Sequence, residues 1–225
     1  ESGGITAYNF IMDKISSLDI TPAQLALDPC SASCVVTATN GEVLACVTYP
    51  GYDNNRLANS VDAEYYNALR NDLSLPLYDY ATQQTTAPGS TFKMVSSVAA
   101  LEEGVVNTSE TITCLGTYET IVPSPKCWIS PGQHGSLNIT GAIEHSCNYF
   151  FYEVGYRLST DALGDYNAEL GLSKLSAYAD MFGLSDKSGI EIVESEPRVS
   201  DELPVSSAIG QGTNNFTTVG LARYV

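Results

Sequence analysis

"APGSTFKMVSSVAALEEG", residues 87–104, decides the fold of this chain. A Pro-Gly turn leads into Ser90, and Lys93 follows three positions later at the start of an apolar run. The apolar spacing predicts a helix over 91–103 that Gly104 ends in the usual C′ position. Ser90 is therefore either the cap of this helix or a nucleophile with Lys93 as its base, and the stretch alone allows both interpretations.

The nucleophile interpretation has a clear physical basis. Positions i and i+3 of a helix face the same side, so the Lys93 ammonium reaches the Ser90 hydroxyl. Free N–H groups and the dipole at a helix N-terminus favour a developing oxyanion. Burial or a nearby dipole must also lower the Lys93 pKa, so that the neutral amine serves as base. The competing interpretation is that serine is a preferred N-cap.

A second motif, "SCN" at residues 146–148, stands at a predicted helix junction. Ser146 could relay a proton between the Lys93 amine and a leaving group, and Asn148 could hold the lysine and a substrate amide. Taken alone, both residues are explained as well by capping, because Ser and Asn favour helix starts. Found downstream of P-G-S-T-F-K, they favour function over capping.

The order of these motifs resembles the penicilloyl-serine transferases, and is most similar to the transpeptidase domain of class B penicillin-binding proteins. Three further stretches agree. "TNGEVLACVTYPGYDNN" (39–55) resembles the first hairpin and loop of that domain, "HGSLNITGAIEHSCNYFFYEVG" (134–155) its second motif, and "AIGQG" (208–212) the approach to its third. The resemblance covers roughly residues 30–225 and is more specific than any single motif.

The resemblance implies an α+β fold of the serine β-lactamase/D,D-peptidase type, with an antiparallel sheet flanked by helices and a mostly helical subdomain. Residues 1–225 would form a partial transpeptidase domain with an incomplete sheet. Within it, 1–60 would hold a helix and the first hairpin, 61–200 a mostly helical region with both motifs, and 201–225 the start of the return to the sheet.

The resemblance also implies peptidoglycan D,D-transpeptidation. Ser90 would attack the D-Ala-D-Ala bond of a stem peptide, release D-alanine and form an acyl-enzyme that an amine of a neighbouring stem resolves. Lys93 matches the family's base, and Ser146 and Asn148 match its second motif. β-Lactams would acylate Ser90, and neither a metal nor an organic cofactor would take part. The full-length protein would be anchored at the extracytoplasmic face of the bacterial cell membrane, associated with a glycan polymerase.

The family's third motif, K-T-G, does not occur in this sequence. Lys187-Ser188-Gly189 spells K-S-G, but it precedes "AIGQG", whereas the third motif comes after that stretch. We interpret it as a chance match and expect the third motif, with further strands of the sheet, beyond Val225. Because losing one oxyanion-hole donor costs ~10²- to 10³-fold in rate, the isolated stretch is expected to have negligible transpeptidase activity.

Two rival functions stay open. A serine β-lactamase or a β-lactam sensor can share S-T-F-K, but Asn148 and the hairpin favour the transpeptidase. Rapid deacylation of a penicilloyl adduct would favour the lactamase. A non-enzymatic binding module is the other alternative, and the presence of both motifs weighs against it.

The remaining predicted elements are a hairpin, several helices and a turn. Two β-branched runs, 33–38 and 42–48, flank Asn40-Gly41, the favoured pair of a two-residue type I′ turn. One face of an opening helix carries Phe10, Ile11, Ile15 and Leu18. Further helices are predicted over 62–72, 141–146 with Thr140 as cap, 147–158, 159–171 and 173–183. Gly210-Gln211-Gly212 is predicted to form a tight turn.

Composition limits the function classes. The formal net charge is −16, from 26 acidic and 10 basic residues, which repels phosphate backbones and argues strongly against nucleic-acid binding. No apolar run approaches the roughly 18 residues of a membrane span. "FTTVGLARYV" (216–225) resembles the first turns of a helix without a stop signal, so we interpret the chain as incomplete.

The six cysteines fit no strong metal-binding spacing; they are Cys30, Cys34, Cys46, Cys114, Cys127 and Cys147. Cys30-x3-Cys34 lacks nearby histidine pairs and is weak evidence for zinc. Cys114 and Cys127 flank a short loop, and both a disulfide and free thiols stay open. His134 and His145 are the only histidines. Nothing supports a Ser-His-Asp triad, so His145 is predicted to be a surface or packing residue. Trp128 and the aromatics of 149–152 are predicted to line the core and cleft.

Overall fold

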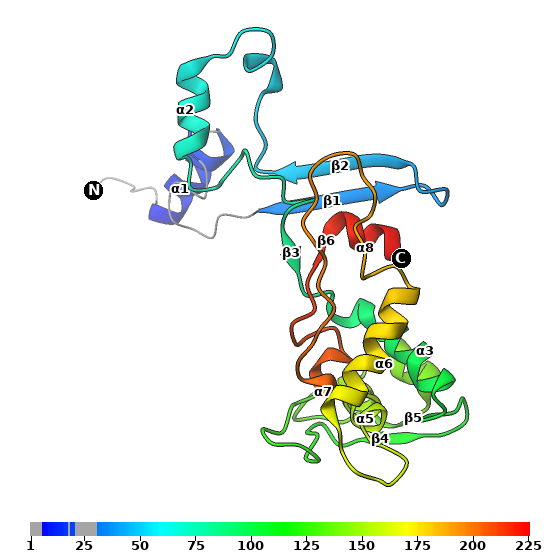
Figure 1. Cartoon of the computed structure of the whole chain (residues 1–225). Helices are drawn as coiled ribbons and strands as arrows, with labels where there is room; N and C mark the ends of the chain where they lie inside the picture. Colours follow the sequence, from blue (N-terminus) through cyan, green and yellow to red (C-terminus); the bar gives the residue numbers. More distant parts are fainter. Residues whose placement is uncertain (1–5, 18, 21–30) are drawn as a thin grey trace. The chain divides into compact units, whose positions relative to one another are not determined.

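The computed structural model describes residues 6–17, 19–20 and 31–225. Leu18 and Cys30, named above, lie outside the described residues. The chain divides into two compact units, residues 1–83 and 84–225, and each is described by itself. Both units contain helices and antiparallel strands, the mixture that the predicted α+β class requires (Figure 1). None of the described helices is long and apolar enough to cross a membrane.

The first unit contains the predicted hairpin. β1 (Ala32–Thr37) pairs antiparallel with β2 (Val43–Tyr49), so both predicted strands are confirmed to within about one residue. The predicted type I′ turn is wrong, because that turn needs a positive φ at both central residues and only Gly41 has one, +88°. Asn40 instead accepts the Glu42 N–H with its side-chain oxygen at 3.0 Å.

Side-chain caps define the helices of the first unit. α1 (Ala7–Ser16) begins after Thr6, whose hydroxyl accepts a first-turn N–H. α2 (Ala63–Asn71) begins after Asp62 in the same way, and a 3-10 turn, η2 (Asn54–Arg56), precedes it. Both predicted helices are confirmed, since each cap satisfies a donor that the helix leaves free. No described residue of α1 is buried, so its apolar face is not a core face.

The second unit is built around three helices. α3 (Lys93–Glu102), α5 (Asn148–Leu158) and α6 (Ala168–Met181) pack against one another, and the short α7 (Pro204–Ser207) lies on α5 and α6 (Figure 1). Their shared core consists of almost fully buried apolar side chains, including Phe92, Val95, Ala99, Phe150, Phe151, Val154, Leu158, Leu175 and Ala179. This core fixes the starts of α3 and α5, where the two sequence motifs lie.

Short elements complete the described part of the second unit. β3 (Thr85–Thr86) pairs with β6 (Phe216–Thr217), and β4 (Ile112–Cys114) pairs with β5 (Gly135–Leu137). α4 (Ile139–Glu144) leads towards α5, and α8 (Thr218–Tyr224) follows β6. The β3–β6 pair therefore joins the segment before Ser90 to a segment far along the chain.

The predicted helix over 159–171 is wrong. Most of that range forms turns closed by a bridge between Thr160 and Tyr166, and α6 begins only at Ala168. α6 then continues through Gly171, where a Cβ would lie 1.9 Å from the Ser159 Oγ. Glycine is needed there for close packing against the end of α5, rather than to end a helix.

Two predicted helix caps are also wrong. Asn138, not Thr140, caps α4, because its side-chain oxygen accepts the Gly141 N–H at 2.9 Å. Ser90 caps no helix, since neither η3 (Gly89–Phe92) nor α3 has a side-chain cap hydrogen bond at its start. The Ser90 hydroxyl is therefore free of the capping role that the sequence also allowed.

The predicted tight turn at Gly210-Gln211-Gly212 is confirmed. Gly210 has a φ of +74°, and its carbonyl accepts the Gly89 N–H at 3.1 Å. A Cβ on Gly210 would lie 2.1 Å from the Gly89 O, so only glycine allows the two backbones to approach this closely. The turn thus holds the backbone immediately before Ser90.

Candidate active site

Ser90 lies in η3, a single 3-10 turn that leads directly into α3. Phe92 anchors this turn in the core, whereas Ser90 is exposed. The Ser90 Oγ lies 3.1 Å from the Lys93 Nζ and 2.9 Å from the Ser146 Oγ. The turn therefore presents a serine hydroxyl to an amine and a second hydroxyl, at a helix start that favours negative charge.

Lys93 is almost fully buried, with 1% of its surface exposed. Its Nζ lies 2.6 Å from the Asn148 Oδ1 and 2.9 Å from the Ser146 O, in addition to 3.1 Å contacts with the Ser90 and Ser146 hydroxyls. None of the ion pairs formed by the described residues involves Lys93. Keeping a buried amine charged without a counter-ion is costly, so burial lowers the pKa of Lys93 and increases the fraction of neutral amine.

The contacts of the Lys93 amine also fit its neutral form. The Asn148 Oδ1 and the Ser146 carbonyl can only accept, so they take two amine hydrogens. The Ser146 hydroxyl donates to the Ser90 Oγ, so the Ser90 hydroxyl is left to donate to the lone pair of the neutral amine. Burial lowers the pKa of Lys93 to about 8, although the Cys147 and Cys127 thiols oppose the shift. Such an amine can take a proton from Ser90 near neutral pH.

The second motif occupies the junction between α4 and α5. Asn148 is the first residue of α5, and Cys147 precedes it. Ser146 has a φ of +48°, a left-handed conformation that non-glycine residues adopt at a cost of ~1–3 kcal/mol. This conformation lets the Ser146 hydroxyl and carbonyl both contact the Lys93 Nζ, so the backbone is shaped around the amine.

All four predicted site residues meet in one hydrogen-bonded network: Ser90, Lys93, Ser146 and Asn148. The K-S-G triplet lies outside it, because Ser188 donates to Glu194 and Lys187 pairs with Glu196. Among the described residues, no hydrogen bond joins either histidine to Ser90. The network thus brings together the side chains that a serine–lysine acyl-transfer centre would use, without the histidine base of a Ser-His-Asp triad.

Comparison with known families matches this geometry. A family model described as the penicillin binding protein transpeptidase domain matches residues 32–225. The chain belongs to the penicillin-binding protein transpeptidase domain family. The resemblance predicted from the sequence motifs is therefore confirmed, and so is the α+β fold class, with small sheets.

Relatives of this penicillin-binding protein domain include named enzymes. Peptidoglycan D,D-transpeptidase MrdA of Escherichia coli K12 is 33% identical over 175 residues, 72% of this chain and 24% of the relative. The chain thus spans about a quarter of the length of that relative. A chain from "Structural coordination of polymerization and crosslinking by a peptidoglycan synthase complex" has a TM-score of 0.72 at 29% identity, covering 86% of this chain and 34% of its own length. The imipenem acyl-enzyme complex of penicillin-binding protein A from M. tuberculosis has a TM-score of 0.70 at 25% identity, covering 85% and 44%.

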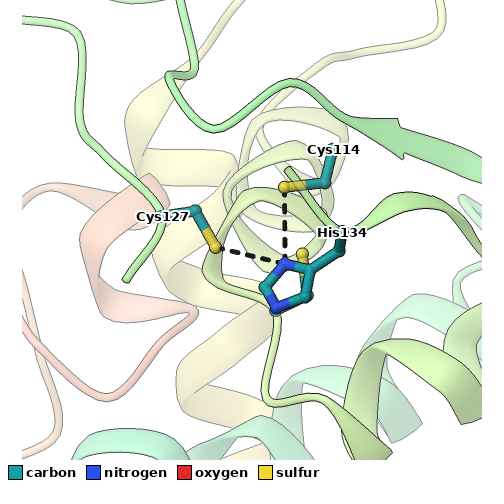
Figure 2. Close-up of side chains that lie close together, drawn as sticks. Cys114, Cys127 and His134 are labelled. Carbon is teal, nitrogen blue, oxygen red and sulfur yellow. Dashed lines mark hydrogen bonds between the residues drawn. The ribbon is translucent and has the colours of Figure 1, made fainter. Parts of the chain in front are cut away.

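A cluster of potential metal ligands was missed by the sequence interpretation of this transpeptidase domain. The ligand atoms of Cys114, Cys127, His134 and Cys147 all lie within 4.8 Å of one another. Figure 2 shows the Cys114 and Cys127 sulfurs facing the same ring nitrogen of His134. All three cysteines are buried free thiols, so the Cys114–Cys127 disulfide that the sequence allowed is not formed. We call these four residues the Cys3His cluster.

The distances in the Cys3His cluster fit a tetrahedral zinc ion. Zn–S bonds of about 2.3 Å and Zn–N bonds of about 2.0–2.1 Å place a sulfur and a nitrogen ligand about 3.6 Å apart. The His134 Nδ1 lies 3.5 Å from the Cys114 Sγ and 3.6 Å from the Cys127 Sγ. Three cysteines and one histidine are one of the standard ligand sets of structural zinc sites.

The surroundings of two cluster thiols differ. Burial opposes ionisation of Cys127, but hydrogen bonds from the Tyr149, Ile129 and Asn148 backbones lower the pKa of its thiol overall. Burial raises the pKa of the Cys147 thiol to about 12. The backbone donors around Cys127 are the outer contacts that a metal-bound thiolate uses. The C-x12-C-x6-H-x12-C spacing of the cluster matches no short zinc motif, so the cluster could not be predicted from the spacing of its residues.

Proposed function

We propose that the intact natural protein containing this chain is a peptidoglycan D,D-transpeptidase whose nucleophile is Ser90. The observation that carries the proposal is the buried Lys93 amine in contact with the Ser90 and Ser146 hydroxyls and the Asn148 amide. The name of the Escherichia coli relative supports this activity, and the imipenem acyl-enzyme of a structural neighbour supports β-lactams as covalent inhibitors.

Acylation begins when the neutral Lys93 amine takes the Ser90 proton. The Ser90 Oγ forms a bond to the carbonyl carbon of the penultimate D-alanine, and N–H groups at the start of η3 and α3 stabilise the oxyanion. The C–N bond then breaks. The leaving D-alanine amine receives the proton from the Lys93 ammonium through the Ser146 hydroxyl, which leaves a Ser90 ester and free D-alanine.

In deacylation the same groups act again, with Ser90 now as the leaving group and an amine as the nucleophile. An amine of a second stem peptide attacks the ester carbonyl while Lys93 takes its proton. The Ser90 alkoxide leaves and recovers a proton from the Lys93 ammonium, and a new amide cross-link remains. Asn148 holds the Lys93 amine through both steps and is proposed to orient the substrate amide.

The activity is tested with the intact protein, a D-Ala-D-Ala stem peptide and an acceptor amine. The expected result is release of one D-alanine for each amide cross-link formed. Hydrolysis of a penicilloyl adduct within minutes, without cross-linking, would instead identify a serine β-lactamase. Failure of both stem peptide and penicillin to acylate Ser90 would identify a binding module.

We expect the rate of Ser90 acylation to rise with pH and to level off above about 8. With the Lys93 pKa lowered to about 8, the neutral base is the minor species in acid and the major species in alkali. Below the pKa its fraction falls about tenfold per pH unit, so the rate near pH 6 should be about 100-fold below the plateau. The measurement is acylation by a fluorescent penicillin between about pH 6 and 9.5. A flat profile would contradict Lys93 as the base.

The location and partners of the intact protein follow from the proposed reaction. Cell-wall peptides are cross-linked outside the cytoplasm, so the domain is proposed to act at the extracytoplasmic face of the membrane. The structural neighbour from a peptidoglycan synthase complex supports association with a glycan polymerase. A membrane anchor in the intact protein and a third motif that completes the oxyanion hole belong to the same proposal.

We also propose that the Cys3His cluster holds a structural Zn²⁺ ion. The supporting observation is the agreement between the nitrogen–sulfur distances of 3.5 and 3.6 Å and tetrahedral coordination. Bound zinc would cross-link β4, which ends at Cys114, and the loops that carry Cys127 and His134 to Cys147, which lies between Ser146 and Asn148. These residues would thereby hold the second motif in place without taking part in bond making.

The zinc content of the intact protein is expected to fall by about one equivalent in Cys114→Ser and in Cys127→Ser, since each change removes a ligand. Cys46→Ser is the control, because Cys46 is an exposed free cysteine outside the cluster. Metal content measured by elemental analysis and the unfolding temperature should fall together in the cluster variants, because metal binding stabilises the folded state. Equal zinc content in all variants would contradict the proposal that the Cys3His cluster binds zinc.

A further inference from the structure

Trp128 is the single tryptophan of this chain and directly follows a cluster cysteine, Cys127. Its side chain is 62% exposed, which is unusual for so large an apolar group. The indole packs edge-on against the His134 ring, with 5.2 Å between ring centroids. The Trp128 ring therefore contacts the Cys3His cluster through His134.

The other edge of the indole reaches the second motif. The Trp128 Nε1–H donates to the Ser146 O at 3.1 Å and to the His145 O at 3.2 Å. The same Ser146 carbonyl accepts from the Lys93 Nζ at 2.9 Å. Trp128 and Lys93 thus share one acceptor, and the indole lies one atom away from the proposed base.

The Ser146 backbone, to which Trp128 donates, has a strained conformation. Ser146 has a left-handed φ of +48°, which a serine adopts only where its surroundings enforce it. Rotation of this peptide would move the Ser146 carbonyl away from Lys93. It would also displace the Ser146 Oγ, which lies 2.9 Å from the Ser90 Oγ. An indole N–H fixed on that carbonyl resists this rotation.

We infer that Trp128 is a positioning residue for the acylation step: its indole N–H holds the Ser146 carbonyl in the orientation that the Lys93 amine requires. The inference rests on the proposed acylation of Ser90. Trp128 acts through Ser146 and touches no reacting atom. Its substitution therefore changes the rate of bond formation rather than the affinity for the acylating compound.

The test compares Trp128→Phe with the unchanged intact protein. Phenylalanine keeps an aromatic ring beside His134 but has no N–H to donate. Acylation by a fluorescent penicillin is measured over a range of concentrations, so that the non-covalent dissociation constant and the acylation rate constant are obtained separately. Loss of one neutral hydrogen bond is expected to lower the rate constant about three- to tenfold, with the dissociation constant changed less than about twofold. Trp128→Ala, which also loses the ring contact, should lower the rate constant further.

Tyr178→Phe is the matched control. It removes an aromatic donor bond of similar length, 3.2 Å from the Tyr178 hydroxyl to Glu103. Glu103 follows the last residue of α3, whereas Lys93 is its first, so this bond lies at the other end of the helix. The control variant is expected to acylate at the unchanged rate. Zinc content is measured in every variant, because Trp128 adjoins the Cys3His cluster.

Each outcome has one meaning. A reduced rate constant with unchanged zinc content and dissociation constant supports Trp128 as a positioning residue. A change in the dissociation constant alone would make Trp128 a wall of the binding site, and a parallel loss of zinc would make it a support of the cluster. Either result overturns the inference, as does an unchanged rate constant. Failure of the unchanged protein to be acylated would instead remove the proposed function.

Discussion

Replacing Ser90 by alanine is expected to abolish covalent labelling of the intact protein by a fluorescent penicillin. The alanine side chain has no oxygen to form the ester, while the rest of the network keeps its place. Ser90 is exposed and caps no helix, so the fold should not depend on its hydroxyl. The rate of D-alanine release should fall on the order of 10⁶-fold, the loss seen when a serine acyl-transfer enzyme lacks its nucleophile.

Thr91→Val is the matched control for Ser90→Ala. It removes the neighbouring hydroxyl, which donates only to the Pro88 O at 2.8 Å, and keeps nearly the same side-chain volume. This variant should label at close to the unchanged rate, and both variants should unfold at similar temperatures. Persistent labelling of Ser90→Ala at another residue would reject the assignment of the nucleophile.

Replacing Lys93 by methionine is expected to lower the acylation rate about 10²- to 10⁴-fold, the usual contribution of a positioned proton-transfer group. Methionine has nearly the volume of lysine without its amine, so Ser90 keeps its place but loses its base. The rate that remains should lose the rise with pH that the Lys93 amine imposes. The measurements are the acylation rate constant at several pH values and the unfolding temperature.

Lys174→Met provides the control for removal of a lysine. Lys174 lies on α6 and pairs with Glu103 at 3.0 Å, so its amine has a structural partner outside the Ser90 network. Acylation should be unaffected in this variant. If Lys93→Met kept the full rate and its pH dependence, a different group would have to act as the base.

The four proposed site residues could be selected from the sequence because the spacing within each pair is short. Ser90 and Lys93 are three positions apart, and Ser146 and Asn148 are two apart, so each pair is placed by one turn of backbone. The sequence suggested that Ser146 and Asn148 contact Lys93, but not the geometry of that contact. That contact depends on the left-handed Ser146 and on the burial of Lys93, which are products of tertiary packing.

The Cys3His cluster was not predictable in the same way. Its ligands come from β4, two loops and the start of α5, with spacings that match no short motif. The wrong end of the predicted helix over 159–171, placed at Gly171, has a related cause. A glycine inside a helical pattern resembles a stop signal, but here it is required by the approach of Ser159 from another segment.

The preference of serine for helix N-caps did not predict the role of the Ser90 side chain. Serine favours helix starts, yet the 3-10 turn of η3 leaves the Ser90 hydroxyl to Lys93 and Ser146. In the hairpin, too, residue preference predicted the position of the turn but not its type. Asn-Gly correctly located the turn, while the side chain of Asn40 and the strand register decided its type.

The close approach of Gly89 and Gly210 sets an order of events during synthesis. The Ser90 turn is held by the Gly210 carbonyl, by the Ala208 carbonyl that accepts from Ser96 at 2.7 Å, and by the pairing of β3 with β6. All three supports emerge more than a hundred residues after the serine. A growing chain therefore contains the proposed nucleophile well before the segments that hold its turn have been made. The contacts that hold the Ser90 turn are complete only after Phe216 and Thr217 have joined the nascent fold.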